Sequence, residues 1–201
     1  MKMEKINGVN RDIKVEADLR LSDAAEARIE DLMHRYPCSN SALLPALYIA
    51  QEECSWLTDR AIRWVASRLN LPLAHVLEVA TFYTMFYKQP VGKYHIQICR
   101  TLSCMLCGAK KLTEQVRKRL NLSAGEVSGD GMWSFEEVEC LGSCGTAPMV
   151  EINDTFFENL TPEKLNDLLN KIEKFKPDLR YSGILEELGK GLEGFPKSSV
   201  W

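Results

Sequence analysis

Four of the seven cysteines in this 201-residue chain form two short pairs. Cys99 and Cys104 make a C-x4-C pair, and Cys140 and Cys144 make a C-x3-C pair further along the chain. Each pair follows a segment typical of a β-strand and leads into a loop, so we expect the four thiols to meet at one edge of a sheet. Thiolates bind zinc, copper(I) or iron–sulfur clusters. The pattern therefore predicts a soft-metal site.

Two metal centres fit these four thiolates. A 2Fe–2S cluster can take all four as ligands, and Gly108, Gly142 and Gly145 would let backbone amides approach its sulfurs. Structural zinc takes the same ligands, and the spacing of the two pairs does not exclude it. The spacing alone leaves the choice between cluster and zinc open.

Cys107 adds two further alternatives. Cys104 and Cys107 form a C-x2-C motif of the kind that thiol–disulfide oxidoreductases use, although this leaves the other three cysteines unexplained. The series Cys99, Cys104 and Cys107 also matches the plant-type run C-x4-C-x2-C. That run normally needs one distant cysteine, whereas here a distant pair is present. We therefore expect Cys107 not to be a ligand.

The composition limits the class of protein. Hydrophobic residues make up 45% of the chain and charged residues 26%, which is typical of a globular protein. A net charge of −3 without a basic stripe predicts no binding to nucleic acid. The sequence predicts neither a membrane-spanning segment nor a secretory signal. We expect a cytoplasmic protein, in which clustered cysteines bind metal or act in catalysis rather than form disulfides.

The first part of the chain predicts a flexible N-terminal arm over residues 1–21, followed by a helical bundle over residues 22–88. Cap residues and apolar spacing predict four short helices. They are a helix from Asp23 that Ser22 caps, Ala42–Glu53 with Ser41 as its cap and Pro45 in its first turn, Asp59–Leu69 with Thr58 as its cap, and a short helix from Pro72 toward Val79. We expect Cys38 and Cys54 in this bundle to be buried small hydrophobic residues.

The pattern changes to mixed strands and helices over residues 89–175. The predicted elements are a strand at Tyr94–Cys99, a helix near residues 108–120, a strand at Phe135–Cys140, a hairpin that turns at Asn153-Asp154, and a helix from Thr161 to Phe175. The order β-α-β-β-β-α is that of a thioredoxin-like domain. The fold class is therefore α+β. Residues 176–201 form a C-terminal extension with no predicted packed element beyond a turn of helix near Leu185–Leu188. We expect it either to lie on a partner protein or to be disordered.

We expect no binding or catalytic role for the remaining residues that could do chemistry. His34, His75 and His95 lack the spacing of metal ligands, so we expect surface or core positions for them. Gly189, Gly191 and Gly194 match the letters of the dinucleotide fingerprint, but they follow no predicted strand and open no helix. We therefore expect no NAD site and no catalytic site on this chain.

Two motifs carry a resemblance that covers roughly residues 22–174. One is Glu78-Val79-Ala80-Thr81-Phe82-Tyr83-Thr84-Met85-Phe86. The other runs from Asp130 through Trp133-Ser134 and Cys140-Leu141-Gly142-x-Cys144 to Ala147-Pro148. Through them the chain resembles the E-subunit family of NADH–quinone oxidoreductase (respiratory complex I), whose members are thioredoxin-like 2Fe–2S ferredoxins. The family usually has Phe at the position of Trp133.

The resemblance implies a function for each part. Cys99, Cys104, Cys140 and Cys144 would bind one 2Fe–2S cluster, and zinc and dithiol chemistry become much less favoured. The partner would be a flavoprotein subunit that carries FMN, the NADH site and a 4Fe–4S cluster. The pair would belong to a larger complex at the inner face of the cell membrane, without inserting in the membrane itself. The equivalent diaphorase subunit of an NAD-dependent hydrogenase or formate dehydrogenase remains the alternative.

Overall fold

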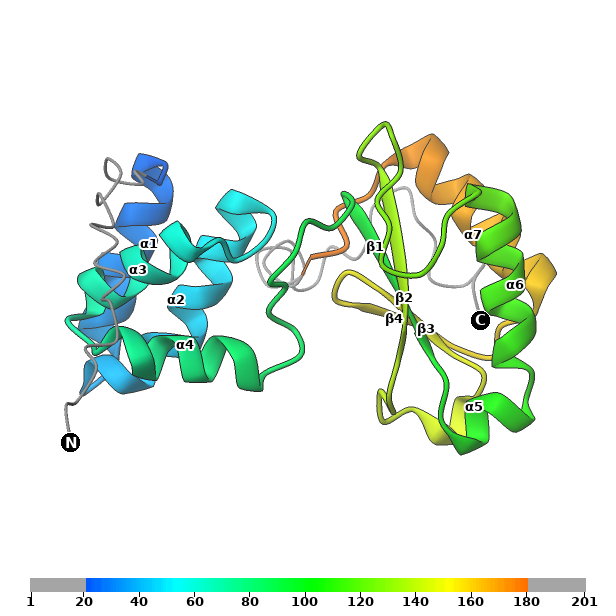
Figure 1. Cartoon of the computed structure of the whole chain (residues 1–201), viewed down its shortest axis with the longest axis horizontal. Coiled ribbons are helices and arrows are strands. Elements are labelled where there is room, and N and C mark those ends of the chain that lie inside the picture. The colour runs from blue at the N-terminus through cyan, green and yellow to red at the C-terminus, as the bar shows by residue number, and fades with distance from the viewer. Residues whose placement is uncertain (1–20, 181–201) are drawn as a thin grey trace, which may run out of the picture. The chain divides into compact units, whose positions relative to one another are not determined.

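The computed structural model describes residues 21–180, which form two compact units that divide between Gln89 and Pro90 (Figure 1). The first unit is helical, and the second combines a four-stranded sheet with helices. Within the described range, no helix combines the length and the hydropathy that crossing a bilayer requires. The predicted α+β class, with helices first and a thioredoxin-like domain second, is confirmed.

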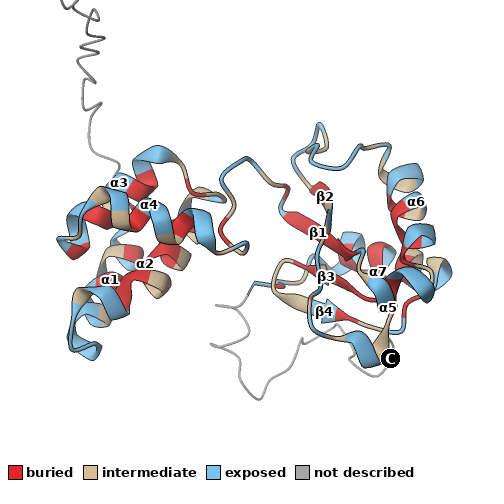
Figure 2. Ribbon diagram, turned by 60° about the horizontal axis from the view of Figure 1, so that its bottom comes forward, coloured by how far each residue is buried: buried red, intermediate tan, exposed pale blue. Residues whose placement is uncertain are grey.

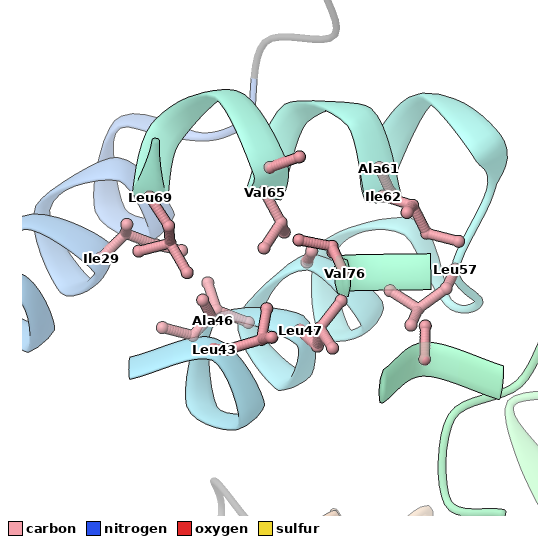
Figure 3. Close-up of a cluster of buried hydrophobic side chains, with 14 of the residues drawn as sticks. Ile29, Leu43, Ala46, Leu47, Leu57, Ala61, Ile62, Val65, Leu69 and Val76 are labelled. Atoms are coloured by element: carbon pink, nitrogen blue, oxygen red, sulfur yellow. The ribbon is translucent and has the colours of Figure 1, made fainter. Parts of the chain in front are cut away.

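Four helices build the first unit: α1 (Asp23–Arg35), α2 (Ser39–Cys54), α3 (Asp59–Leu69) and α4 (Leu73–Phe82). Ser22 and Thr58 cap α1 and α3 as predicted, because each hydroxyl accepts a hydrogen bond from the backbone amide three residues later. Apolar residues at helical spacing turn one side of each helix inward. The buried side chains of these helices point toward one another and form a common core (Figure 3).

The motif Glu78–Phe86 begins in α4, and its last residues are anchored in that core. Phe86 is fully buried and stacks edge-on against Tyr48. The amide side chain of Gln51 donates to the carbonyl of Met85 at 2.9 Å and accepts from the amide of Tyr87 at 2.7 Å. These two bonds satisfy backbone groups that no regular element pairs. Only part of the motif therefore packs as core: Ala80 and Phe86 are buried, whereas Phe82 is 76% exposed.

Helix α2 differs from its prediction. It begins at Ser39 rather than Ala42, so Pro45 lies inside the helix instead of in its first turn. Cys38, not Ser41, takes the extended cap position, and its Sγ lies 3.3 Å from the Ser41 hydroxyl. The expected burial is wrong for Cys38, which is exposed, and Cys54 is only half-buried. Cys38 is the N-cap of α2 and Cys54 is its last residue, and at both ends of a helix a side chain lies closer to solvent.

The second unit is built on a mixed sheet with the strand order β2-β1-β3-β4. Strand β1 (Tyr94–Cys99) runs parallel to β2 (Trp133–Val138) and antiparallel to β3 (Val150–Ile152), which pairs with β4 (Thr155–Phe157) in a hairpin. Three helices, α5 (Leu102–Leu106), α6 (Ala109–Leu120) and α7 (Pro162–Phe175), complete the unit. A crossover with a helix is what two parallel neighbours require.

One face of the sheet is apolar and the other is polar. Ile96 and Ile98 of β1 pack with Phe135, under the apolar sides of α6 and α7 (Figure 2). On the opposite face His95 is buried, with Nδ1 at 2.8 Å from the Ser134 hydroxyl and Nε2 at 3.1 Å from Glu136. His95 is therefore a hydrogen-bonded core residue.

Three details of this unit differ from the sequence prediction. Helix α5 forms where a loop was expected. Strand β2 lies two residues earlier than predicted, because its parallel register pairs Cys99 with Val138. Packing also continues beyond α7, since the Leu179 carbonyl accepts from the amide of Asp154 and Leu179 is fully buried. The N-terminal arm up to residue 20, the turn near Leu185–Leu188 and the glycines at 189–194 lie outside the described residues.

The polar face of the sheet also predicts a pH-dependent stability. Glu151 in β3 lies opposite Gln97 and Phe156. Burial, and then the charge of Asp154, raises the pKa of Glu151 from 4.5 to about 7. Folding therefore favours the protonated carboxyl, so the destabilisation is absent below pH 4.5, grows between pH 4.5 and 7, and is complete above about pH 7.

We expect Glu151→Gln to remove this dependence. The variant should be more stable than the parent protein by about 1–2 kcal/mol at pH 8, a figure reduced for partial exposure. Near pH 5 the two proteins should unfold almost together. Thermal unfolding at both pH values measures the difference, and an equal difference at both would contradict the assignment.

Candidate metal centre

Parallel pairing of β1 with β2 brings the two cysteine pairs to one edge of the sheet. Parallel strands end on the same side, and the register places Cys99, the last residue of β1, beside Val138, the last residue of β2. Cys140 follows two residues after β2, so the expectation that it ends the strand is wrong. The convergence of the two loops nevertheless holds, because both leave the same sheet edge.

Residues next to the cysteines join the two loops. The Arg100 amide donates to the carbonyl of Val138 at 3.0 Å. The Arg100 guanidinium also donates to Glu139 through Nε at 3.2 Å and Nη2 at 2.7 Å. Arg100 follows Cys99, and Glu139 precedes Cys140. This ion pair, which no local sequence pattern indicates, joins the starts of the two loops.

The first pair is buried. Cys99 and Cys104 have 1% and 2% of their surface exposed, and they pack with Ala109 and Met149 in a small apolar cluster. Cys104 lies on α5, in a segment for which the sequence predicts a loop. Helix α5 has only five residues, Leu102–Leu106, which is too few to show a helical period in the sequence. The helix is therefore seen only in the structure, where Cys104 is its buried residue.

The second pair is exposed. The sulfurs of Cys140 and Cys144 lie 3.4 Å apart, and the Gly142 amide donates to Cys140 Sγ at 3.4 Å. Gly142 has φ of +87°, a backbone conformation that favours glycine. Ser143 and Thr146 both hydrogen-bond to Glu158, which holds the loop in place. The loop thus directs a backbone amide at a sulfur, as predicted for Gly142.

The electrostatics of the two pairs differ. Burial raises the pKa of the Cys104 thiol to about 11. Burial also acts on Cys99, but hydrogen bonds from Thr101 and the Leu141 amide outweigh it, so its pKa is lowered. In the exposed pair, the Gly142 amide lowers the pKa of Cys140, whereas the hydrogen bond with Cys140 raises that of Cys144. The four thiols therefore interact as one group.

The donor set fits a 2Fe–2S cluster. Four thiols converge as two adjoining pairs, and a backbone amide is directed at one of the sulfurs, which are the groups that such a cluster needs. Within residues 21–180, no three His, Cys, Asp or Glu side chains lie close enough together to hold a metal ion. Cys107 is exposed beyond the end of α5.

The fold and the thiol arrangement define a class, a thioredoxin-like domain with two cysteine pairs at one end of its sheet. The family model of the thioredoxin-like [2Fe-2S] ferredoxin matches residues 29–173. The E subunit of NADH-quinone oxidoreductase from Rickettsia bellii (strain RML369-C) is 44% identical over 146 residues, 71% of this chain and 87% of the relative. The E 2 subunit of the same enzyme from Rhizobium meliloti (strain 1021) is 38% identical over 156 residues, 78% of this chain and 91% of the relative.

The chain therefore belongs to the thioredoxin-like [2Fe-2S] ferredoxin family, and its predicted place in the E-subunit group is confirmed. A solved structure supports the fold. A chain of an NAD+-reducing [NiFe]-hydrogenase in the air-oxidised state superposes with a TM-score of 0.58 at 23% identity. The match covers 66% of this chain and 23% of the hydrogenase chain, so the likeness concerns the fold alone.

Proposed function

We propose that this chain is an electron-transfer subunit of an NADH–quinone oxidoreductase, with Cys99, Cys104, Cys140 and Cys144 as the ligands of one 2Fe–2S cluster. The observation that carries the proposal is the convergence of the two thiol pairs at the shared end of β1 and β2. When bound, the cluster accepts and releases single electrons.

The family match supports a binuclear centre over zinc. Structural zinc takes the same four thiolates, but the family model that covers residues 29–173 is that of a [2Fe-2S] ferredoxin. The buried pair and the exposed pair, each with its own close partner, also suit two metal ions that take two thiolates each.

The structure also weighs against a dithiol enzyme. A reactive C-x2-C site needs an accessible thiolate with a lowered pKa at its first cysteine. Cys104 is buried among apolar residues, and only Cys107 is exposed. The protein therefore lacks the accessible attacking sulfur that this chemistry requires at Cys104.

The two sides of the candidate centre would have different roles. The apolar cluster around Cys99 and Cys104 excludes water from one side. The exposed pair lies at the protein surface, where another redox group can approach. The Gly142 amide stabilises negative charge on Cys140 Sγ. Electron exchange would then take place at the exposed side.

We further propose the partner and the location. The partner is a flavoprotein subunit with FMN, the NADH site and a 4Fe–4S cluster, which forms a heterodimer with this chain inside a membrane-associated complex. The location is the cytoplasmic side of the cell membrane, reached through that complex. The described residues offer a surface site for electron exchange at Cys140 and Cys144, and such a site suits a carrier whose substrate chemistry is on another subunit.

One experiment tests the function and the partner together. The isolated chain, reduced with dithionite, should give the rhombic low-temperature EPR signal of a 2Fe–2S centre and should not be reduced by NADH. In the complex purified from native cells through a tag on this chain, NADH alone should produce the signal. A colourless or zinc-containing protein with dithiol activity would refute the cluster. Copurification of a hydrogenase or molybdenum subunit in place of membrane subunits would assign the chain to the alternative complexes.

A further inference from the structure

Thr101 lies between the two thiol pairs, in the turn that follows β1. It occupies the N-cap of α5, where a threonine hydroxyl ordinarily accepts a hydrogen bond from the helix. Thr58 and Thr161 make that bond in α3 and α7, but Thr101 does not. Its hydroxyl instead lies 3.0 Å from Cys99 Sγ. The hydroxyl is therefore directed at the candidate centre and not at the helix.

The same hydroxyl also interacts with the second pair. After the Gly142 amide and Cys144, the Thr101 hydroxyl is the next group that lowers the pKa of Cys140. Thr101 thus contacts one thiol of the buried pair and acts electrostatically on one thiol of the exposed pair. Helix α5 packs against the short helical turn at Cys144–Thr146, which keeps the two loops close to Thr101.

The chemistry of a bound centre determines the direction of these hydrogen bonds. A cysteine that binds iron is a thiolate and has no proton to give. The Thr101 hydroxyl must then be the donor, to Cys99 or shared with Cys140. Reduction adds negative charge to the centre, so a donated hydrogen bond stabilises the reduced form more than the oxidised form.

We infer that Thr101 is a positioning residue that sets the reduction potential of the centre by donating its hydroxyl proton to the thiolates that join the two pairs. The inference rests on the proposed function, because it requires that the four cysteines bind the cluster. It assigns to the C-x4-C loop a role beyond supplying two ligands.

The test is the midpoint potential of Thr101→Val, which keeps the shape of the side chain and removes the hydroxyl. We expect the reduction equilibrium to become about tenfold less favourable, which for a one-electron couple is a fall of about 59 mV. Thr101→Ser, which keeps the hydroxyl, should retain a potential close to that of the parent protein. EPR-monitored redox titration of the full-length protein measures all three potentials.

Thr113→Val is the matched control. Thr113 is buried in α6, and its hydroxyl donates to Glu137 at 3.0 Å rather than to a sulfur. The control should leave the potential unchanged. If Thr101→Val does not assemble the cluster while Thr101→Ser does, the hydroxyl holds the pairs together instead of setting the potential, and the inference is overturned.

Three results of the titration would each overturn the inference. They are an unchanged potential in Thr101→Val, equal shifts in Thr101→Val and Thr101→Ser, and an equal shift in the Thr113→Val control. Loss of assembly in both Thr101 variants would also overturn it, since the hydroxyl would then not be the cause. Failure of the proposed function is recognised separately, because the parent protein would then give no 2Fe–2S signal at all.

Discussion

The Cys140→Ala variant is expected to purify without its cluster. Alanine removes one ligand of the exposed pair and leaves no atom that can bind iron, whereas a serine would keep an oxygen at the same place. Cys144 would then remain without the sulfur that lies 3.4 Å away. We expect the visible absorption, the EPR signal and the bound iron and sulfide to fall to near zero. Iron and sulfide analysis of the purified variant measures the loss directly.

Cys107→Ala is the matched control for this experiment. Cys107 is exposed and belongs to the C-x4-C-x2-C run, so it is the competing ligand on spacing alone. We expect this variant to contain as much iron as the parent protein. Loss of the cluster in Cys107→Ala together with its retention in Cys140→Ala would show that the ligand set is wrong.

The Gly92→Ala variant is expected to lose much of its stability. Gly92 lies against the start of β2, where an added Cβ would be 2.4 Å from the carbonyl carbon of Trp133 and 2.7 Å from the amide nitrogen of Ser134. The Gly92 amide also donates to the Ser134 hydroxyl at 2.8 Å. Because the clash is with backbone, the strands must separate, at a cost of about 3 kcal/mol.

Thermal unfolding measures this cost. We expect Gly92→Ala to lower the melting temperature by roughly 10 °C. Gly129→Ala is the matched control, since a Cβ at Gly129 would meet no atom within 4 Å. The control should change the unfolding free energy by less than about 0.5 kcal/mol. Equal melting temperatures for the two variants would contradict the close approach of Gly92 to β2.

The elements with clear local signals were predicted well. Thr58 and Thr161 are hydroxyl caps ahead of amphipathic runs, and α3 and α7 begin directly after them. Strand β1 has the predicted bounds, because alternating β-branched and aromatic residues are flanked by Gly92 and the first cysteine loop.

Predictions failed where local signals were weak. Helix α5 is too short for a period, and a serine near the start of α2 suggested a later cap than the one that Cys38 occupies.

By itself the sequence determined the chemistry that is available and the family. The number and spacing of the thiols limited the site to soft metals or redox sulfur, and the motifs around Cys140 and Cys144 predicted the E-subunit group. These conclusions depend on residue type and order, which the chain carries locally.

Only the tertiary structure decided how the thiols are divided and what surrounds them. It shows that one pair is buried and the other exposed, and that Arg100 joins the loops through Glu139. Each of these features depends on the parallel register of β1 and β2, which brings together residues far apart in the chain. Spacing along one segment cannot specify contacts that form between two.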